Sequence, residues 1–289
     1  MESKAINHES SRARWQAYRR RPLSLLLRLA VTVSAAITVF VLIALVAYIL
    51  IKGIPNLRPS LFAWEYTSEN ASMLPAIINT ITMTVLSLLM AVPVGICSAI
   101  YLVEYAKRGN KLVSLVRITA ETLQGIPSIV YGLFGFLFLV VACKFGYSLL
   151  SGAITLAIMI LPLILRTTEE ALKAVPDLYR EGSFGLGAGR LRTVFRIVLP
   201  SAVPGILAGV ILAIGRIVGE TAALIYTSGT VAGVPDTLMG SGRTLAVHMY
   251  ALLSNGLYTE EAYATAVVLL VMVIGINALS GWLAKKVSA

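Results

Sequence analysis

Two charged residues lie four positions apart inside an apolar stretch, and their types and spacing could do chemistry. Arg216 and Glu220 interrupt the run PGILAGVILAIGRIVGETAALIYTSG, which extends from about Pro204 to Ser228. A helix that begins at Pro204 would carry Arg216 about 18 Å along its axis, near the middle of a membrane. Residues four apart share one helix face, so we expect Glu220 beside Arg216. Ionisable residues at that depth cost several kcal/mol and usually mark a pathway or a partner contact.

An arginine beside a glutamate can recognise a protonated oxyanion. The guanidinium group has a planar fork of donors that matches a tetrahedral oxyanion bidentately. The carboxylate of Glu220 would accept a hydrogen bond from a protonated phosphate and would repel a fully ionised sulfate. The alternative is an ion pair in which Arg216 and Glu220 neutralise each other and only hold the helix. Both interpretations remain open at this point.

A second segment could place hydroxyl groups at the same site. Gly125-Ile126-Pro127 interrupts another apolar run, Thr122–Cys143. A broken membrane helix frees backbone groups, which must then face protein or a cavity. Ser128 and Tyr131 follow the break directly, so we count both as candidate pathway residues. For each of them the alternative is a kink that is packed by small residues.

The elements that must position these residues are membrane helices. The 289 residues are 57% hydrophobic and only 13% charged, with a mean hydropathy of +0.84, whereas soluble domains carry about a quarter charged residues. A bilayer core about 30 Å thick requires roughly 20 apolar residues of helix. The sequence therefore predicts an all-α integral membrane protein with six transmembrane helices. The predicted spans are Leu29–Ile51, Ala76–Leu102, Thr122–Cys143, Gly146–Leu165, Pro204–Ser228 and Ala262–Ala284.

The basic residues predict the orientation of these spans. Most of the 24 Lys and Arg residues lie in the tail through Arg28, in Lys107–Arg117, in Arg166–Arg196 and at the C-terminus. These segments alternate across six spans, so both termini are expected in the cytoplasm of a bacterial inner (cytoplasmic) membrane. Because the basic residues flank apolar runs and form no face, the net charge of +10 does not indicate a nucleic-acid partner. The first apolar run is too long for a cleaved signal, so we expect a retained helix.

The stretch between the fourth and fifth predicted spans has a regular pattern. Residues 166–203 read RTTEEALKAVPDLYREGSFGLGAGRLRTVFRIVLPSAV. Pro176 favours a helix over Asp177–Phe184, and the glycines that follow should turn the chain. Arg190–Ile197 should then form an amphipathic helix that ends at Leu199-Pro200. The glycines do not have the spacing of a phosphate-binding loop, so we expect no nucleotide site in this chain.

This stretch is similar to the EAA loop of permeases from ATP-binding cassette (ABC) importers. That pattern is E-A-A, three residues, G, nine residues, then I-x-L-P. Here Glu181-Gly182-Ser183, Gly187 and Ile197-Val198-Leu199-Pro200 stand at those spacings, with Gly182 and Ser183 in place of two alanines. In this family the loop docks into an ATP-binding subunit and moves as a rigid body. The resemblance implies that ATPase coupling depends on Glu181, Gly182, Ser183, Gly187, Leu199 and Pro200.

Two other segments resemble phosphate-specific permeases of the PstA type. They are GIPSIVYG at residues 125–132 and GETAA at residues 219–223, and the second adds Thr221 to the candidate pathway. Over residues 25–285 the resemblance implies a MetI-like permease fold and one membrane subunit of an ATP-driven phosphate importer. It implies no catalytic residue, cofactor or metal in this chain. The implied partners are a homologous permease (PstC type), an ATP-binding dimer (PstB type) and a periplasmic phosphate-binding protein (PstS type).

The expected domain plan follows from the spans and the resemblance. It comprises a basic cytoplasmic tail (1–28), a first transmembrane helix (29–51), a periplasmic loop (52–73) and a permease domain (74–286) with its coupling loop (166–203). His248 is expected in a packed external helix over Thr244–Leu253. One alternative function is the import of another oxyanion, such as phosphonate or molybdate. A proton-coupled carrier with Glu220 as its proton site would not require an EAA loop and would usually show two similar halves, which the sequence does not have. A membrane assembly factor would not predict charges in the middle of the membrane.

Overall fold

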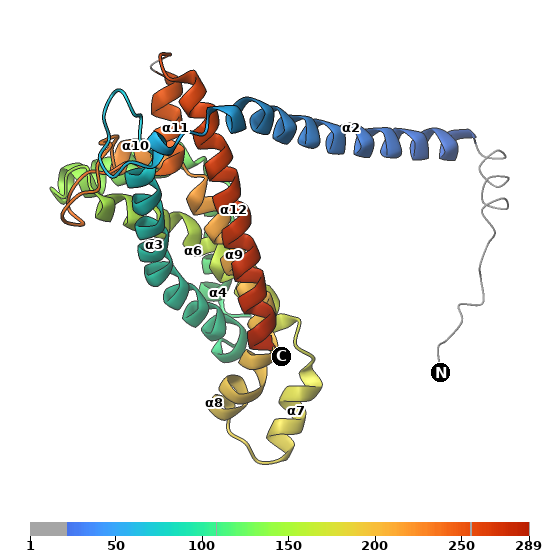
Figure 1. Cartoon of the computed structure of the whole chain (residues 1–289). Coiled ribbons are helices and arrows are strands. Elements are labelled where there is room, and N and C mark those ends of the chain that lie inside the picture. The colour runs from blue at the N-terminus through green and yellow to red at the C-terminus, as the bar shows by residue number, and fades with distance from the viewer. Residues whose placement is uncertain (1–21, 108, 255, 289) are drawn as a thin grey trace. The chain divides into compact units, whose positions relative to one another are not determined.

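The computed structural model describes residues 22–107, 109–254 and 256–288, and this part of the chain is helical with no strand (Figure 1). The predicted all-α fold is therefore confirmed. In chain order the helices are α2 Pro22–Gly53, α3 Leu74–Ile100, α4 Lys111–Gln124, α5 Ser128–Gly135, α6 Leu149–Lys173, α7 Asp177–Gly185, α8 Arg190–Thr193, α9 Leu199–Val218, α10 Ala222–Thr227, α11 Leu245–Ser254 and α12 Thr259–Ser288. Short 3-10 turns lie at η1 Ile54–Asn56 and η2 Pro59–Phe62, and π-helical turns lie at η3 Tyr101–Tyr105, η4 Phe136–Ala142 and η5 Val194–Val198.

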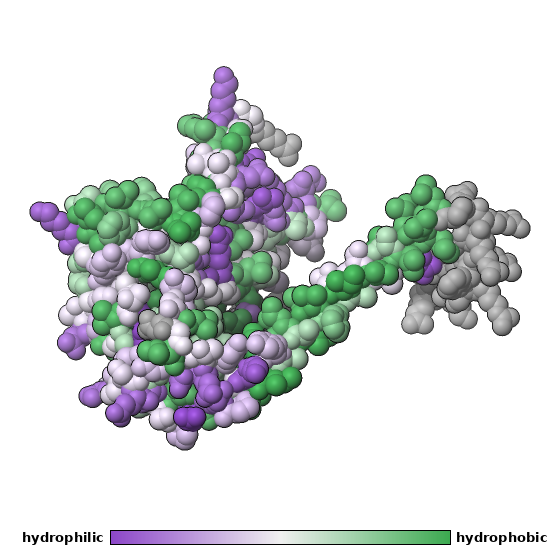
Figure 2. All heavy atoms as spheres, turned by 90° about the horizontal axis from the view of Figure 1, so that it is seen from above, coloured by the Kyte–Doolittle hydropathy of each residue, from purple (hydrophilic) through white to green (hydrophobic). Residues whose placement is uncertain are grey.

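The chain forms two compact units, which divide between Ile51 and Lys52. The first unit is the greater part of α2, whose surface is almost entirely apolar (Figure 2). A helix that is hydrophobic on all sides is typical of a membrane span. The predicted span Leu29–Ile51 lies within α2. The basic tail expected over residues 1–28 falls mainly on residues 1–21, which lie outside the described part.

The second unit is built on four long helices. Helix α3 packs against α6, α6 packs against α9, and α9 packs against α12. Helices α7 and α8 lie at one end of this bundle, and α10 and α11 lie toward the other (Figure 1). Over both units, five of the described helices are long and apolar enough to cross a membrane, and the bent pair α4–α5 makes a sixth candidate.

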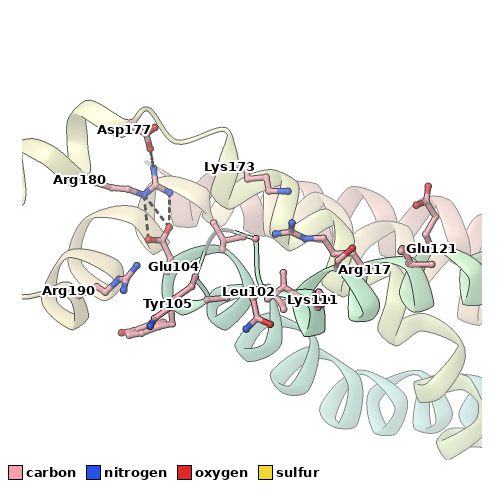
Figure 3. A pocket seen from close by; sticks show the side chains of 18 of the residues that line it. Leu102, Glu104, Tyr105, Lys111, Arg117, Glu121, Lys173, Asp177, Arg180 and Arg190 are labelled. Carbon is pink, nitrogen blue, oxygen red and sulfur yellow. Dashed lines mark hydrogen bonds and ion pairs between the residues drawn. The ribbon is translucent and has the colours of Figure 1, made fainter.

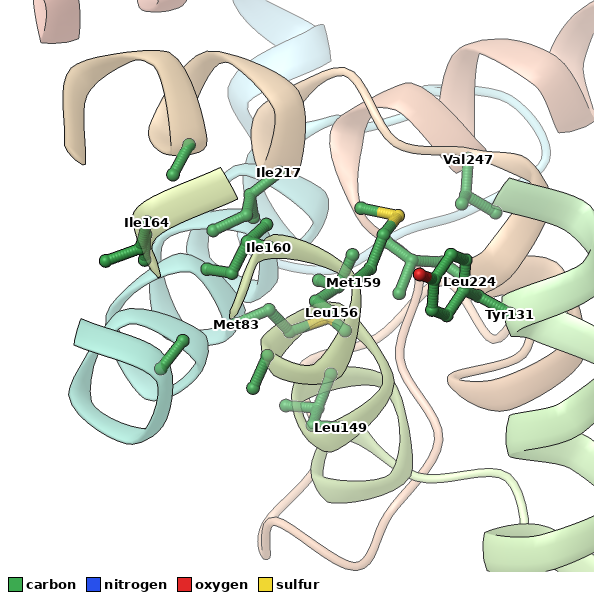
Figure 4. Packing of buried hydrophobic residues seen from close by; sticks show 13 residues of the cluster. Met83, Tyr131, Leu149, Leu156, Met159, Ile160, Ile164, Ile217, Leu224 and Val247 are labelled. Atoms are coloured by element: carbon green, nitrogen blue, oxygen red, sulfur yellow. The ribbon is translucent and has the colours of Figure 1, made fainter. Parts of the chain in front are cut away.

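Small residues let the long helices approach closely. A Cβ atom at Gly205 of α9 would lie 2.7 Å from the Cβ of Ala171 on α6, and one at Gly95 of α3 would lie 2.7 Å from Ile164 on α6. Membrane helices gain little from burying apolar surface, because lipid is also apolar, and they associate through such close packing. Ile164 also belongs to a buried core (Figure 4), which includes Met83, Leu149, Leu156, Met159, Ile160, Ile217, Leu224 and Val247.

The predicted break at Gly125–Pro127 is present, but the surrounding prediction needs correction. Helices α4 and α5 meet there at a bend of 102°. The basic segment Lys107–Arg117, which the span prediction left between two membrane helices, is largely helix α4. Asn110 caps this helix by accepting a hydrogen bond from the Leu112 amide at 2.9 Å. The chain therefore enters this span through a separate amphipathic helix, which the apolar run Thr122–Cys143 did not indicate.

The fifth predicted span differs at both ends. The helix is continuous from Arg190 to Val218, so Leu199-Pro200 does not end it. A proline ring inside a helix clashes with the carbonyl four residues earlier, and the wider π turn η5 lies at that position before Pro200. At the other end Gly219 terminates α9 well before Ser228, so a separate short helix, α10, follows.

Candidate functional site

The prediction that Arg216 and Glu220 share one helix face was wrong, because α9 ends at Val218 and Glu220 lies outside it. Arg216 is half-buried in the last turn of α9, while Glu220 is buried beyond the end of that helix. The Glu220 Oε1 atom accepts a hydrogen bond from the Ala223 amide at 3.1 Å. Both side chains lie in the described part of the chain, and they form no ion pair with each other. The helix ends at Gly219, so the four-residue spacing no longer sets their relation.

The carboxylate of Glu220 stabilises the first turn of α10. Helix N-termini have free amide groups that favour a negatively charged acceptor. At α10 the Ala223 amide donates to one carboxylate oxygen of Glu220. The other oxygen, Oε2, has no hydrogen-bond partner among the described residues and is not sealed from solvent. Glu220 therefore combines a structural contact with one acceptor that remains available.

Tyr131 closes the break between α4 and α5. Its hydroxyl group donates a hydrogen bond to the carbonyl of Leu123 at 2.8 Å, just before the break. Backbone carbonyls that a broken membrane helix leaves free must find such partners. The Tyr131 hydroxyl group therefore satisfies a backbone carbonyl next to the break.

The two sequence segments around the breaks pack directly against each other. A Cβ atom at Gly132 on α5 would lie 2.7 Å from Cα and 3.1 Å from the carbonyl oxygen of Ala223 on α10. Contact this close is possible only because residue 132 is a glycine. It brings Tyr131 into the neighbourhood of Glu220 and Thr221, although about ninety residues separate them in the sequence.

The remaining pathway candidates have looser surroundings. Thr221 is half-buried at the start of α10, and its hydroxyl group reaches only the Gly219 carbonyl at 3.5 Å. Ser128 is half-buried at the first position of α5, one helical turn before Tyr131. The structure therefore gathers all five predicted residues near the two breaks, where α9 ends and α5 begins.

The predicted turn of the coupling loop is present. Helix α7 ends as expected, and Gly187 follows it with φ +80°, a conformation that residues with a side chain rarely adopt. The Gly187 amide donates to the Phe184 carbonyl at 2.9 Å, and the Ala188 amide donates to the Ser183 carbonyl at 3.1 Å. Such paired bonds are typical of a glycine that terminates a helix.

The predicted coupling residues divide between the surface and the interior. Glu181, Gly182 and Gly187 are exposed, whereas Ser183 is buried and its hydroxyl group shares a hydrogen bond with that of Thr193 at 2.8 Å. Ser183 therefore holds α7 against α8 and does not face a partner. On α9, Leu199 is half-buried and Pro200 is exposed.

The coupling loop also has an apolar surface. The side chain of Leu186 is 92% exposed. Other exposed apolar residues of the loop are Leu178, Tyr179, Phe184, Leu191 and Phe195. Exposed apolar patches outside the membrane mark sites of protein interaction. This loop therefore has the surface of a docking element.

A polar cluster that the sequence did not reveal lies at the opposite end of the bundle. The Arg243 guanidinium lies 4.7 Å above the ring of Tyr66, a cation–π geometry, and burial lowers the pKa of Arg243. His248 on α11 is fully buried beside Tyr66, as a packed helix predicts. Burial, followed by the charge of Arg243, lowers the pKa of His248 to about 3. A single histidine in an apolar run gives no signal of such an environment.

The geometry agrees with a comparison to known protein families. The family described as "Binding-protein-dependent transport system inner membrane component" matches residues 91–289. The chain belongs to this family. It is therefore a multi-pass membrane permease of an ABC importer, as the EAA loop implied, and membership implies ATP-binding and substrate-binding partners.

Individual relatives cover most of the permease. This chain is 32% identical over 276 residues to the probable ABC transporter permease protein YqgI of Bacillus subtilis, and the match covers 88% of this chain and 92% of that protein. It is 35% identical over 230 residues to the phosphate transport system permease protein PstA of Pasteurella multocida, covering 78% and 81%. With PstA of Mycobacterium leprae it shares 35% identity over 205 residues, which cover 70% and 67%.

Solved structures of ABC transporters share the fold. A chain of a bacterial transporter that imports the acidic polysaccharide alginate has a TM-score of 0.63 at 19% identity, covering 95% of this chain and 99% of that one. A chain of the inward-facing MetNI methionine transporter has a TM-score of 0.57 at 19% identity, covering 84% and 98%. The expected MetI-like permease fold is therefore confirmed.

Proposed function

We propose that this permease is a membrane subunit of an ATP-driven phosphate importer and forms half of its pathway. Relatives named phosphate transport system permease protein PstA support phosphate as the substrate. A homologous permease of the PstC type would form the other half. ATP-binding subunits of the PstB type and a phosphate-binding protein of the PstS type would complete the importer.

The observation that carries this proposal is the state of Arg216. Its guanidinium is half-buried in an apolar helix and has no acidic partner among the described residues. A charge in such a place is costly unless an opposite charge arrives to offset it. A passing phosphate supplies that charge and matches the donor fork of arginine. The second carboxylate oxygen of Glu220 would accept a hydrogen bond from the hydroxyl group of a monohydrogen phosphate, and sulfate has no such hydroxyl group.

ATP hydrolysis would take place in the partner subunits. The exposed apolar side chains around Leu186 would enter a cleft of an ATP-binding subunit, so that closure of the ATPase moves α7. This role requires α7 in the cytoplasm, and the basic segments predict the same orientation with both termini inside. The permease itself would then bind no nucleotide and catalyse no reaction.

The experiment is phosphate uptake by proteoliposomes that contain the complete transporter. Arg216→Gln should abolish uptake of radiolabelled phosphate, and Arg216→Lys should restore little because an ammonium group lacks the planar fork. The double variant Arg216→Gln/Glu220→Gln should assemble and remain inactive. Uptake near the wild-type rate in that double variant would refute an anion path through Arg216. Arg58→Gln, an exposed arginine far from α9 in sequence, is the control and should retain uptake.

The same vesicles separate the competing functions. Sulfate, molybdate and a phosphonate, each added in excess, should compete weakly with phosphate, and strong competition by one of them would identify a different oxyanion. Uptake should require ATP inside the vesicles together with the ATP-binding subunits. Uptake driven by a proton gradient alone would instead establish a carrier with Glu220 as its proton site.

A further inference from the structure

A cleft of about 1070 Å³ lies where the coupling helix α7 meets the ends of α3 and α4 (Figure 3). At its edge Arg180 of α7 contacts Glu104 of the π turn η3, 76 residues earlier. The Arg180 Nη2 atom donates to Glu104 Oε1 at 2.7 Å, and Nε donates to the same oxygen at 3.2 Å. The two side chains are only 14% and 7% exposed. The contact is therefore a largely buried, two-pronged ion pair.

The same guanidinium group also bonds the end of α6. Its Nη2 atom donates to the Leu172 carbonyl at 2.9 Å, and Nη1 donates to the Val175 carbonyl at 2.8 Å. Carbonyls at the end of a helix have no partner within that helix, and α6 ends at Lys173. One side chain of α7 therefore joins the ends of two long helices, α3 and α6.

Helix α7 has few other attachments. All its residues are described, and Ser183 alone among them is buried. Ser183 bonds Thr193 at the start of the continuous helix Arg190–Val218, and this bond holds α7 to that helix. Leu178, Tyr179 and Phe184 are exposed. The bonds of Arg180 are thus the main polar link between the coupling helix α7 and the ends of α3 and α6.

A buried ion pair is weak evidence of a contribution to stability, because desolvation offsets the attraction between the charges. A fork of fixed donors does, however, set a direction and a distance. Here the fork holds three elements in one relative position. Such a contact can transmit a rigid-body movement of α7 to α3 and α6.

We infer that Arg180 is a positioning residue that locks the coupling helix to α3 and α6, so that movement of α7 carries both helices with it. Glu104 and the carbonyls of Leu172 and Val175 are its fixed partners. This inference rests on the proposed function, in which α7 receives the movement of an ATPase. Without the bonds of Arg180, α7 would move relative to α3 and α6, and ATP would be hydrolysed without transport.

The test measures ATP hydrolysis and phosphate uptake in the same proteoliposomes containing the complete transporter. The double variant Arg180→Gln/Glu104→Gln removes both charges, so that neither is left unpaired in the interior. It should assemble and hydrolyse ATP, while the phosphate taken up per ATP hydrolysed falls at least roughly tenfold. Arg180→Lys keeps the charge and loses the fork, and it should lower the same ratio. An unchanged ratio in either assembled variant overturns the inference.

Further arms of the experiment remove the remaining ambiguities. Arg166→Gln is the matched control, because Arg166 lies near the same end of the bundle in exposed ion pairs with Glu121 and Glu170, and its ratio should match wild type. If both Arg180 variants fail to assemble, Arg180 is a folding residue and the inference is overturned. If the wild-type transporter takes up no phosphate, the proposed function fails instead, and the ratio is measured with the anion that it does transport.

Discussion

Replacing Gly132 with alanine tests whether the two helix breaks must touch. The new Cβ atom would lie 2.7 Å from the Cα atom and 3.1 Å from the carbonyl oxygen of Ala223. Carbon atoms in contact are normally about 3.5–4.0 Å apart, so α5 and α10 must separate by about 1 Å. Overpacking of this kind costs about 1–3 kcal/mol. The displacement also moves Glu220, because the Ala223 amide of α10 donates a hydrogen bond to its Oε1 atom at 3.1 Å.

Thermal unfolding of the purified complex and phosphate uptake measure the two consequences. A loss of 1–3 kcal/mol corresponds to a fall in Tm of roughly 2–12 °C for a chain of this size. Uptake should fall further than stability accounts for, because Glu220 shifts with α10. Gly125→Ala, in the same broken span, is the control. Its Cβ atom would lie an ordinary 3.5 Å from the Thr122 carbonyl oxygen.

A comparison with Gly135 on the same helix sharpens the test. There a Cβ atom would meet side chains, those of Thr155 and of Thr227, whose Cγ2 atom would be 2.7 Å away. Thr155→Ala with Thr227→Ser should therefore rescue Gly135→Ala. Ala223→Gly should not rescue Gly132→Ala, because that clash is with backbone. Wild-type Tm and uptake in Gly132→Ala, or rescue by Ala223→Gly, would refute the reasoning.

Three other predictions concern the ends of the bundle. Gly187→Val should abolish uptake at an unchanged level in the membrane, because φ +80° costs a residue with a side chain about 1–2 kcal/mol and more for a β-branched one; Gly187→Asn should retain part of the uptake, and equal uptake in both variants would contradict this. In the same loop, cysteine at exposed Leu186 should crosslink to an ATP-binding subunit, whereas cysteine at buried Ser183 should not. For His248 the pKa of about 3 lies below the ordinary 6.5, so the folded chain favours the neutral ring. The contribution of the neutral His248 ring to the free energy of unfolding is complete above pH 6.5 and is lost as the pH falls toward 3. At pH 5 the free energy of unfolding is lower by roughly 2 kcal/mol. The pH dependence of Tm between pH 7.5 and 5 should therefore be smaller in His248→Leu, and an unchanged dependence would refute the assignment.

The sequence by itself determined the features that depend on neighbouring residues. Apolar runs long enough for a bilayer predicted the helices, and Gly125–Pro127 predicted the break, because these signals act within a few residues. Pro176 and the glycines that follow predicted the short helix α7 and the turn at Gly187 for the same reason. The family followed from these local patterns. The orientation of the spans and the roles of the pathway residues remain predictions.

Only the tertiary structure decided how distant residues meet. The four-residue spacing of Arg216 and Glu220 would place them together in a continuous helix, but Gly219 ends α9, and α10 then packs on Gly132 of α5. The ion pair between Glu104 and Arg180 spans 76 residues. In the sequence Glu104 looks like an ordinary charge at the end of an apolar run, and Arg180 looks like an ordinary charge in a polar loop. Periodicity describes one helix at a time. Contacts between helices depend on crossing positions and close approach, which local spacing does not encode.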